Sequence, residues 1–142
     1  MNTKDINYRA WLDEQELFKM KTRYFYNAQV IKVVDGDTLD LLIDLGFGSR
    51  RLERIRLAGP NCKGFDAPEV RGEEKAAGLE AKDLLIEKFN LYPHVVIETF
   101  QEKGKYGRYI ASVFGEQDSV AFAGKDLATY LVESGLGEWK EY

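Results

Sequence analysis

The stretch that decides the fold is residues 24–58, which read YFYNAQVIKVVDGDTLDLLIDLGFGSRRLERIRLA. Its first third is rich in aromatic and β-branched residues, which favour strands. Leucine or isoleucine then occupies every second position from 39 to 45, and residues 52–58 alternate in nearly the same way, as half-buried strands do. Asp35-Gly36 is a hairpin signal between the first two runs, and residues 46–49 interrupt the pattern before the third. The stretch therefore predicts a meander of three strands, at about 24–34, 39–45 and 52–58.

Downstream of this meander the sequence predicts two helices and two further strands. In the first helix Ala77, Ala81, Leu85 and Phe89 recur every four residues, which places them on one face. The second helix ends at Gly135, a typical C-cap. In chain order the predicted elements are a loop at 59–74, a helix at about 73–90, strands at 94–101 and 109–114, and a helix at 125–134. This order is the connectivity of an OB-type barrel, so we predict a β-rich α+β fold, a five-stranded OB-type barrel with two or three helices.

The chain divides at about residue 23. Residues 1–23 form an N-terminal extension, polar with scattered large apolar side chains whose spacing predicts a short helix: Tyr8, Trp11, Leu12 and Phe18. Residues 24–142 form the predicted OB-fold domain, long enough to bury one core. No apolar run approaches the roughly 20 residues of a membrane helix, and the N-terminus lacks the apolar stretch of a signal peptide. We therefore expect a cytoplasmic protein with no membrane partner.

Composition weighs against several classes of function. The single cysteine, Cys62, excludes an internal disulfide and cannot by itself build a zinc site. The single histidine, His94, opens an apolar strand-like run and is a poor base for a nucleophilic triad. The net charge of −4 weighs against a protein that coats nucleic acid by charge alone. It does not weigh against an enzyme that binds one phosphate through a metal.

Two acidic motifs are candidates for metal chemistry. In Asp35-Gly36-Asp37-Thr38 the ordinary interpretation is a hairpin turn, but carboxylates are depleted in strands, and Asp37 at a strand end is well placed to bind a hard cation. In Asp66-Ala67-Pro68-Glu69 the ordinary interpretation is a helix N-terminus, yet the helix signal begins later. Asp37 and Asp66 could together hold one calcium ion, with backbone carbonyls and waters as further ligands. Glu69 would then be free to act as a base on a water.

Two arginines could complete a phosphate site. Arg56 lies on a predicted strand just before the second acidic motif, and Arg108 lies in the glycine-flanked turn Gly104-Lys105-Tyr106-Gly107-Arg108. A guanidinium grips phosphate oxygens through two parallel hydrogen bonds and stabilises negative charge that develops on them. Taken singly, each arginine is more often a surface salt-bridge partner, so the hypothesis depends on the combination.

In this combination the sequence resembles the staphylococcal-nuclease-like (thermonuclease) family, over about residues 24–140. Four motifs occur in that family's order: Asp35-Gly36-Asp37-Thr38, Arg56-Leu57-Ala58-Gly59, Asp66-Ala67-Pro68-Glu69 and Lys105-Tyr106-Gly107-Arg108. Gly135-Leu136 is also similar to the family's closing segment. The resemblance implies a calcium-dependent nuclease that hydrolyses phosphodiester bonds in DNA, RNA or both.

The resemblance also implies a role for each matching residue. The calcium ligands fall on Asp37, Asp66 and the backbone carbonyl of Ala67, with Asp35 as a nearby acid outside the ligand set. The general base falls on Glu69, and the phosphate-binding arginines on Arg56 and Arg108. Two further residues match positions that contact a neighbouring phosphate of the substrate: Lys105 and Tyr106.

Three features depart from the family pattern. Residues 60–64 are an insertion of about five residues beside the predicted metal. Arg54 competes with Arg56 for the phosphate role, because both lie on the same strand face by alternation, and we choose Arg56 for the Leu-Ala-Gly that follows it. Trp139 and Tyr142 lie near the family's base-stacking tyrosines without aligning with them.

Two alternatives remain open. The first is a non-catalytic OB-type module that binds nucleic acid or a protein partner. The second keeps the enzyme and replaces calcium with another hard divalent cation, which a cluster of acids also accepts.

Overall fold

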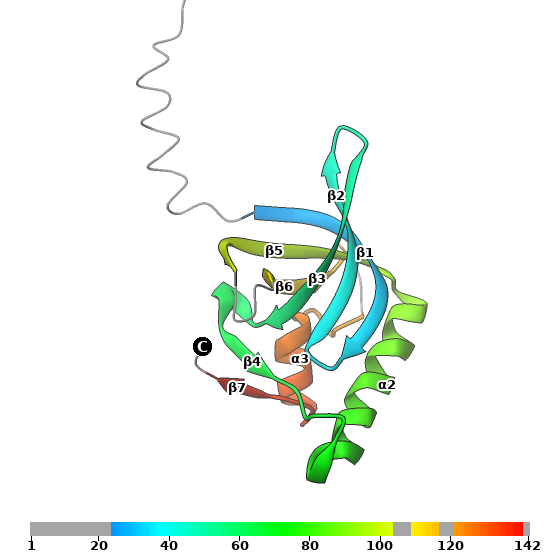
Figure 1. Cartoon of the computed structure of the whole chain (residues 1–142), viewed down its shortest axis with the longest axis vertical. Coiled ribbons are helices and arrows are strands. Elements are labelled where there is room, and N and C mark those ends of the chain that lie inside the picture. Colours follow the sequence, from blue (N-terminus) through cyan, green and yellow to red (C-terminus); the bar gives the residue numbers. More distant parts are fainter. Residues whose placement is uncertain (1–23, 104–108, 117–120, 141–142) are drawn as a thin grey trace, which may run out of the picture.

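The computed structural model describes residues 24–103, 109–116 and 121–140, and its centre is a closed β-barrel (Figure 1). Strand order around the barrel is β1-β2-β3-β6-β5, returning to β1. All neighbours are antiparallel except β3 and β6, which pair in parallel with Ile55 opposite Tyr109. The barrel strands are β1 (Tyr24–Asp35), β2 (Thr38–Gly46), β3 (Ser49–Ala58), β5 (His94–Lys103) and β6 (Tyr109–Gly115). This closed five-stranded barrel confirms the predicted OB-type α+β fold.

Helix α2 (Lys75–Leu91) packs along β1, and helix α3 (Leu127–Glu133) packs against β6 (Figure 1). Helix α2 buries Ala81, Leu85 and Phe89 on one face, as the four-residue spacing predicted. Gly78 takes the buried place at the start of this face, while Ala77 is only half-buried. Helix α3 begins at the cap Asp126, whose carboxylate accepts a hydrogen bond of 3.1 Å from the Thr129 N–H.

The core fills the barrel and the spaces under the two helices. Its fully buried side chains come from alternate positions of the strands, as expected when one strand face points inward, and from the inner faces of the helices. They include Leu39, Leu41, Ile55, Leu57, Ile97, Val113, Leu127 and Leu131. No helix among the described residues is long and apolar enough to cross a membrane.

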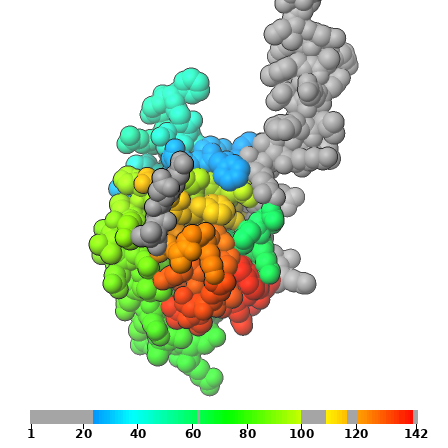
Figure 2. Space-filling model, turned by 180° about the vertical axis from the view of Figure 1, so that it is seen from behind, coloured from blue at the N-terminus to red at the C-terminus, as the bar shows by residue number. Residues whose placement is uncertain are grey.

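The hairpin of β2 and β3 is longer than predicted and projects beyond the barrel (Figures 1 and 2). Strand β3 begins at Ser49, not near residue 52, because polar residues 49–51 extend the pairing with β2 outside the core, where no apolar alternation marks them. The turn at its tip holds Phe47, which is fully exposed at a positive φ of 54°, a conformation that is uncommon for a bulky residue.

The segment predicted as a loop at 59–74 contains short ordered elements. These are the 3-10 turns η1 (Pro60–Cys62) and η2 (Gly72–Glu74) and the strand β4 (Gly64–Asp66), which pairs with β7 (Glu138–Lys140). Strands of three residues are too short to show a period of two, so the sequence did not reveal this small sheet. Residues 1–23 lie outside the described residues, and their predicted helix stays a prediction.

Candidate functional site

The turn between β1 and β2 places Asp37 beside strand β3. The Leu57 N–H donates a hydrogen bond of 2.8 Å to the Asp37 carbonyl oxygen. The Thr38 hydroxyl donates to Asp37 Oδ1 at 3.0 Å, and Thr38 pairs with Arg56 in the β2–β3 register. The Asp35-Gly36-Asp37-Thr38 motif is therefore a hairpin turn, as its ordinary interpretation holds, and it also brings a carboxylate to the end of β3.

Asp37, Arg56 and Asp66 meet in what we call the acid–arginine cluster. Arg56 Nη2 lies 2.5 Å from Asp66 Oδ1 and 3.6 Å from Asp37 Oδ2. The same nitrogen donates to the Phe65 carbonyl oxygen at 3.2 Å. The three side chains are 16–26% exposed, so their charges interact more strongly than those of surface pairs.

A close backbone approach fixes the two acidic motifs relative to each other. A Cβ at Gly36 would lie 2.8 Å from the Ala67 Cβ and 3.2 Å from the Ala81 Cβ. Any side chain at Gly36 would push the hairpin turn away from the segment that carries Asp66 and from helix α2. Gly36 therefore serves close packing as well as the turn.

Glu69 follows Asp66 on a segment without regular secondary structure, whose backbone lies against helix α2. Its side chain is exposed, and its N–H donates to Glu74 Oε2 at 3.2 Å. A Cβ at Gly78 would lie 2.1 Å from the Glu69 carbonyl oxygen and 2.4 Å from its carbonyl carbon. The absence of a side chain at Gly78 thus sets where the Glu69 backbone lies.

We expect Gly78→Ala to destabilise the protein, although alanine favours helices more than glycine by about 1 kcal/mol. The new Cβ would meet backbone atoms of Glu69 that cannot move without shifting the whole segment. Overpacking of this kind costs about 1–3 kcal/mol, which lowers the melting temperature by roughly 3–10 °C in a domain of this size. Calorimetry of the purified variant measures the shift.

Ala76→Gly is the control for Gly78→Ala, because Ala76 is exposed on the same helix and reports the propensity difference without a close contact. A melting temperature of Gly78→Ala equal to or above that of the unmodified protein would show that the Glu69 segment is not held by this contact.

Arg54 has a different partner from Arg56. Its Nε donates to Asp40 Oδ1 at 2.7 Å and its Nη2 to Asp40 Oδ2 at 3.1 Å. The Arg54 guanidinium holds the pKa of Asp40 below its ordinary value, and Asp40 in turn raises the pKa of Arg54. Of the two competing arginines, Arg56 is the one that lies beside Asp37 and Asp66.

Lys140 is a member of the site that sequence reasoning missed. Its Nζ forms an ion pair with Asp66 Oδ2, and this hydrogen-bonded carboxylate raises the pKa of Lys140. The β4–β7 pairing places Lys140 opposite Gly64, two positions from Asp66. Only the three-dimensional pairing reveals this contact, because the two residues are far apart in the sequence.

The insertion at residues 60–64 folds back on itself beside the cluster. The Gly59 N–H donates to the Lys63 carbonyl oxygen at 2.8 Å, and the Lys63 N–H to that of Pro60 at 3.2 Å. Lys63 Nζ lies 4.5 Å from the centre of the Trp139 ring, and a Cβ at Gly59 would meet this ring at 2.3 Å. Trp139 therefore anchors the insertion.

Of the other predicted site residues, the structure describes Asp35 but not those in the turn at 104–108. Asp35 is half-buried at the end of β1, opposite Thr38 in the β1–β2 register. Three predicted substrate-binding and catalytic residues lie outside the described residues, as does Tyr142: Lys105, Tyr106 and Arg108.

The donor chemistry of the cluster fits a hard divalent cation. Asp37 and Asp66 each place a carboxylate oxygen near the same Arg56 nitrogen, and Ala67, with its backbone carbonyl, follows Asp66 in the sequence. Within the described part of the chain no group of three or more His, Cys, Asp or Glu side chains is arranged to hold a metal. Two carboxylates would leave the remaining ligand positions of calcium to carbonyls and waters.

A protein-family model matches the greater part of the chain. The sequence model described as staphylococcal nuclease homologue matches residues 54–142, which include Arg56, Asp66 and Glu69 and begin after Asp37. The comparison with curated proteins found no match.

Proposed function

Because this match covers more than half of its length, the chain belongs to the staphylococcal nuclease homologues, and we propose that it is a calcium-dependent nuclease. Its substrates are DNA, RNA or both, and its reaction is hydrolysis of a phosphodiester bond. The observation that carries the proposal is the acid–arginine cluster, in which Asp37, Arg56 and Asp66 from three separate segments converge on one guanidinium nitrogen. Two acids and an arginine so arranged are what metal-assisted phosphate chemistry needs.

The acidic residues divide into ligands and base in this proposal. Asp37, Asp66 and the Ala67 carbonyl would hold calcium, which when bound supplies positive charge that polarises the phosphate and makes a nearby water more acidic. Glu69 takes the proton of the attacking water. Its carboxylate is exposed, which leaves it accessible to that water.

Arg56 stabilises the charge that builds up on the phosphate. The bonds of Arg56 to the Phe65 carbonyl and to Asp66 both start at Nη2, and a guanidinium has five N–H donors in a planar fork. A phosphate oxygen that displaces the Asp66 carboxylate would therefore be held by the same guanidinium. Calcium would at the same time replace the positive charge that Arg56 gives to the two acids. Arg108 is proposed as the second phosphate-binding arginine, with Lys105 and Tyr106 at the neighbouring phosphate.

The decisive experiment compares cleavage of denatured DNA and of RNA with calcium and with EDTA, together with the melting temperature under both conditions. We expect cleavage only with calcium. An ion at about 100 times its Kd that binds only the folded state adds about 2.7 kcal/mol to stability, or roughly 5–10 °C in melting temperature. Asp66→Asn is the matched variant, and it should lose both effects.

Three outcomes separate the possibilities. Equal cleavage with calcium and with EDTA would contradict the mechanism. Cleavage that manganese or magnesium supports and calcium does not would keep the enzyme and change the ion. A melting temperature that calcium leaves unchanged would place the ion, if any is needed, elsewhere than on Asp37 and Asp66.

A second candidate function is a binding module without catalysis, and one observation favours it. Both carboxylate oxygens of Asp66 are engaged by cations of the chain itself, Arg56 on one and Lys140 on the other. A cluster neutralised in this way can be a structural ion-pair network. This candidate predicts binding of single-stranded nucleic acid or of a protein, with no cleavage under any metal condition.

A further inference from the structure

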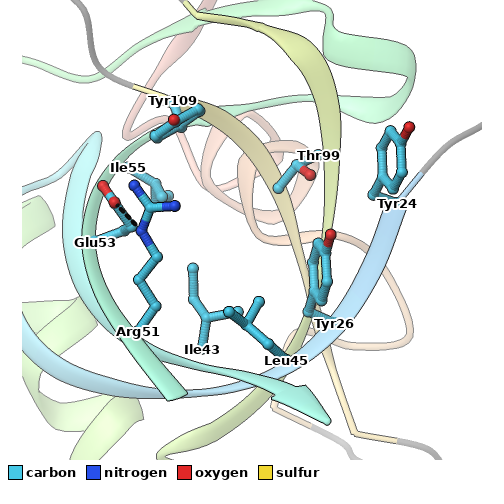
Figure 3. A pocket seen from close by; sticks show the side chains of 9 residues that line it. All are labelled: Tyr24, Tyr26, Ile43, Leu45, Arg51, Glu53, Ile55, Thr99 and Tyr109. Atoms are coloured by element: carbon cyan, nitrogen blue, oxygen red, sulfur yellow. Dashed lines mark ion pairs between the residues drawn. The ribbon is translucent and has the colours of Figure 1, made fainter. Parts of the chain in front are cut away.

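A cavity lies at the barrel end where β2 ends and β3 begins, whereas the acid–arginine cluster lies where β2 begins and β3 ends. Figure 3 shows this cavity from close by. The cavity has a volume of about 220 Å³, and all five barrel strands contribute to its wall. The start of β3 and the end of β2 form one side, where the projecting hairpin leaves the barrel. The start of β1 forms another, with Tyr24 and Tyr26. The cavity is therefore open at the barrel mouth.

The wall of this cavity combines aromatic rings with charged groups. Tyr26 and Tyr109 stand on different sides of it, and the Arg51 guanidinium points between them (Figure 3). Arg51 Cζ lies 5.8 Å from the centre of the Tyr109 ring, and Arg51 Nε lies 2.6 Å from Glu53 Oε1. Thr99 adds a hydroxyl group.

The position of the charged pair is unusual for a barrel strand. Along β3, Ile55 and Leu57 point inward and are fully buried, and the same face continues to Glu53 and Arg51 by alternation. An inward face that only served packing would carry apolar residues there too. Charged and aromatic groups around a cavity are instead the features of a binding site.

We propose that this barrel-mouth pocket binds one unpaired base of a single-stranded nucleic acid, an inference that rests on the proposed action on nucleic acid. The cavity is smaller than the roughly 300–1,000 Å³ of sites for drug-sized ligands, and it suits a single flat ring system. Tyrosine rings stack on bases of any sequence. Glu53 accepts a hydrogen bond from an exocyclic amine of the base, and Arg51 adds a cation–π contact.

Strand β3 connects the pocket to the proposed reaction centre. It carries four arginines and one acid over residues 49–58, in a chain whose net charge is −4. Arg51 and Arg56 are five positions apart on this strand, which is about 17 Å at the usual rise. A base held in the pocket would therefore be several nucleotides from the phosphate at Arg56, so short substrates cannot reach both sites.

The test is binding of fluorescein-labelled oligodeoxycytidylate of ten and of two nucleotides, whose bases carry the exocyclic amine, measured by anisotropy in EDTA and low salt. EDTA removes the calcium that the proposed cleavage needs, so this measurement reports binding alone. We expect Tyr109→Leu to raise the Kd of the ten-nucleotide strand about tenfold, as loss of one stacked base does. Arg51→Ala should raise it about fivefold. The dinucleotide can occupy only one of the two sites at a time, so it should bind more weakly than the ten-nucleotide strand.

Arg50→Ala is the matched control, since it removes the same charge one position away on the other face of the strand. It should change the Kd less than about twofold. Because Tyr109 also contacts the core, the melting temperature of Tyr109→Leu is measured as well, and Arg51→Ala, on the exposed hairpin, tests the site if that variant unfolds.

The two proposals fail differently in this experiment. Wild-type Kd values in folded Tyr109→Leu and Arg51→Ala, or an equal effect of Arg50→Ala, would overturn the pocket whether or not the protein cleaves DNA. A selective loss of binding in the pocket variants, in a protein that cleaves nothing with any metal, would support the pocket and overturn the nuclease proposal.

Discussion

Replacing Arg56 by methionine should lower the rate of calcium-dependent cleavage about a thousandfold. Removing one preorganised donor that stabilises developing charge costs about 10²–10³ in rate, and Arg56 is the described arginine that lies beside both Asp37 and Asp66. Methionine keeps much of the length and apolar stem of arginine, so the neighbouring packing is preserved. Initial rates on denatured DNA at saturating calcium measure the effect.

The same variant should bind calcium more tightly. Without the guanidinium, the carboxylates of Asp37 and Asp66 repel each other and lose a competing cation. The variant should therefore melt at a lower temperature in EDTA, and calcium should raise its melting temperature more than it raises that of the unmodified protein. Opposite changes in rate and ion binding would distinguish a phosphate-binding role from general damage to the fold.

Arg54→Met is the control for Arg56→Met. It removes the same charge from the same strand, two positions away, but its partner is Asp40. Its cleavage rate should stay within about threefold of the unmodified protein, as for loss of a surface pair. A large loss in Arg54→Met with none in Arg56→Met would reverse the assignment of the two arginines.

Replacing Glu69 by glutamine should lower the cleavage rate roughly a thousandfold, within the 10²–10⁴ range for loss of a general base. Glutamine has nearly the same shape but cannot take a proton from water. Since the Glu69 side chain is exposed, the melting temperature of the Glu69→Gln protein in EDTA should differ little from that of the unmodified protein. The rise in melting temperature with calcium should persist, because Glu69 is not a proposed ligand.

Glu73→Gln serves as the matched control for Glu69→Gln, because Glu73 is also exposed and lies on the neighbouring turn η2. Its rate should equal that of the unmodified protein. If Glu69→Gln cleaves as fast as Glu73→Gln, another group or the solvent takes the proton. If it loses the calcium effect on melting, Glu69 is a ligand and not a base.

The elements with a strong local signal could be predicted from the sequence. Alternating apolar positions in 39–45 and 52–58 identified β2 and β3, and the four-residue spacing of Ala81, Leu85 and Phe89 identified the buried face of α2. The start of β3 and the β4–β7 pair could not be predicted. The start of β3 lies outside the core, where the residues are polar and show no apolar alternation. The β4–β7 pair depends on pairing between distant segments.

The acidic residues of the candidate site and Arg56 could be predicted from the sequence, because they lie in short motifs. Their mutual contacts could not, since Asp37, Arg56 and Asp66 meet only through the hairpin, the barrel and the β4 segment. Lys140 carries no local signal at all, and its contact with Asp66 follows from the β4–β7 register. The roles of Gly36 and Gly78 were likewise hidden, because each depends on which backbone or side chain lies opposite.

The parallel seam between β3 and β6 has a consequence for how the chain folds. Paired residues such as Arg56 and Ile110 are distant in the sequence. Pairings of this kind form slowly, because the entropy of loop closure is lost before the new contacts stabilise the chain. Arg56 lies within the seam itself. The contact between Asp37 and Arg56 depends only on the local β2–β3 hairpin, whereas the position of Asp66 also depends on β7, near the other end of the domain.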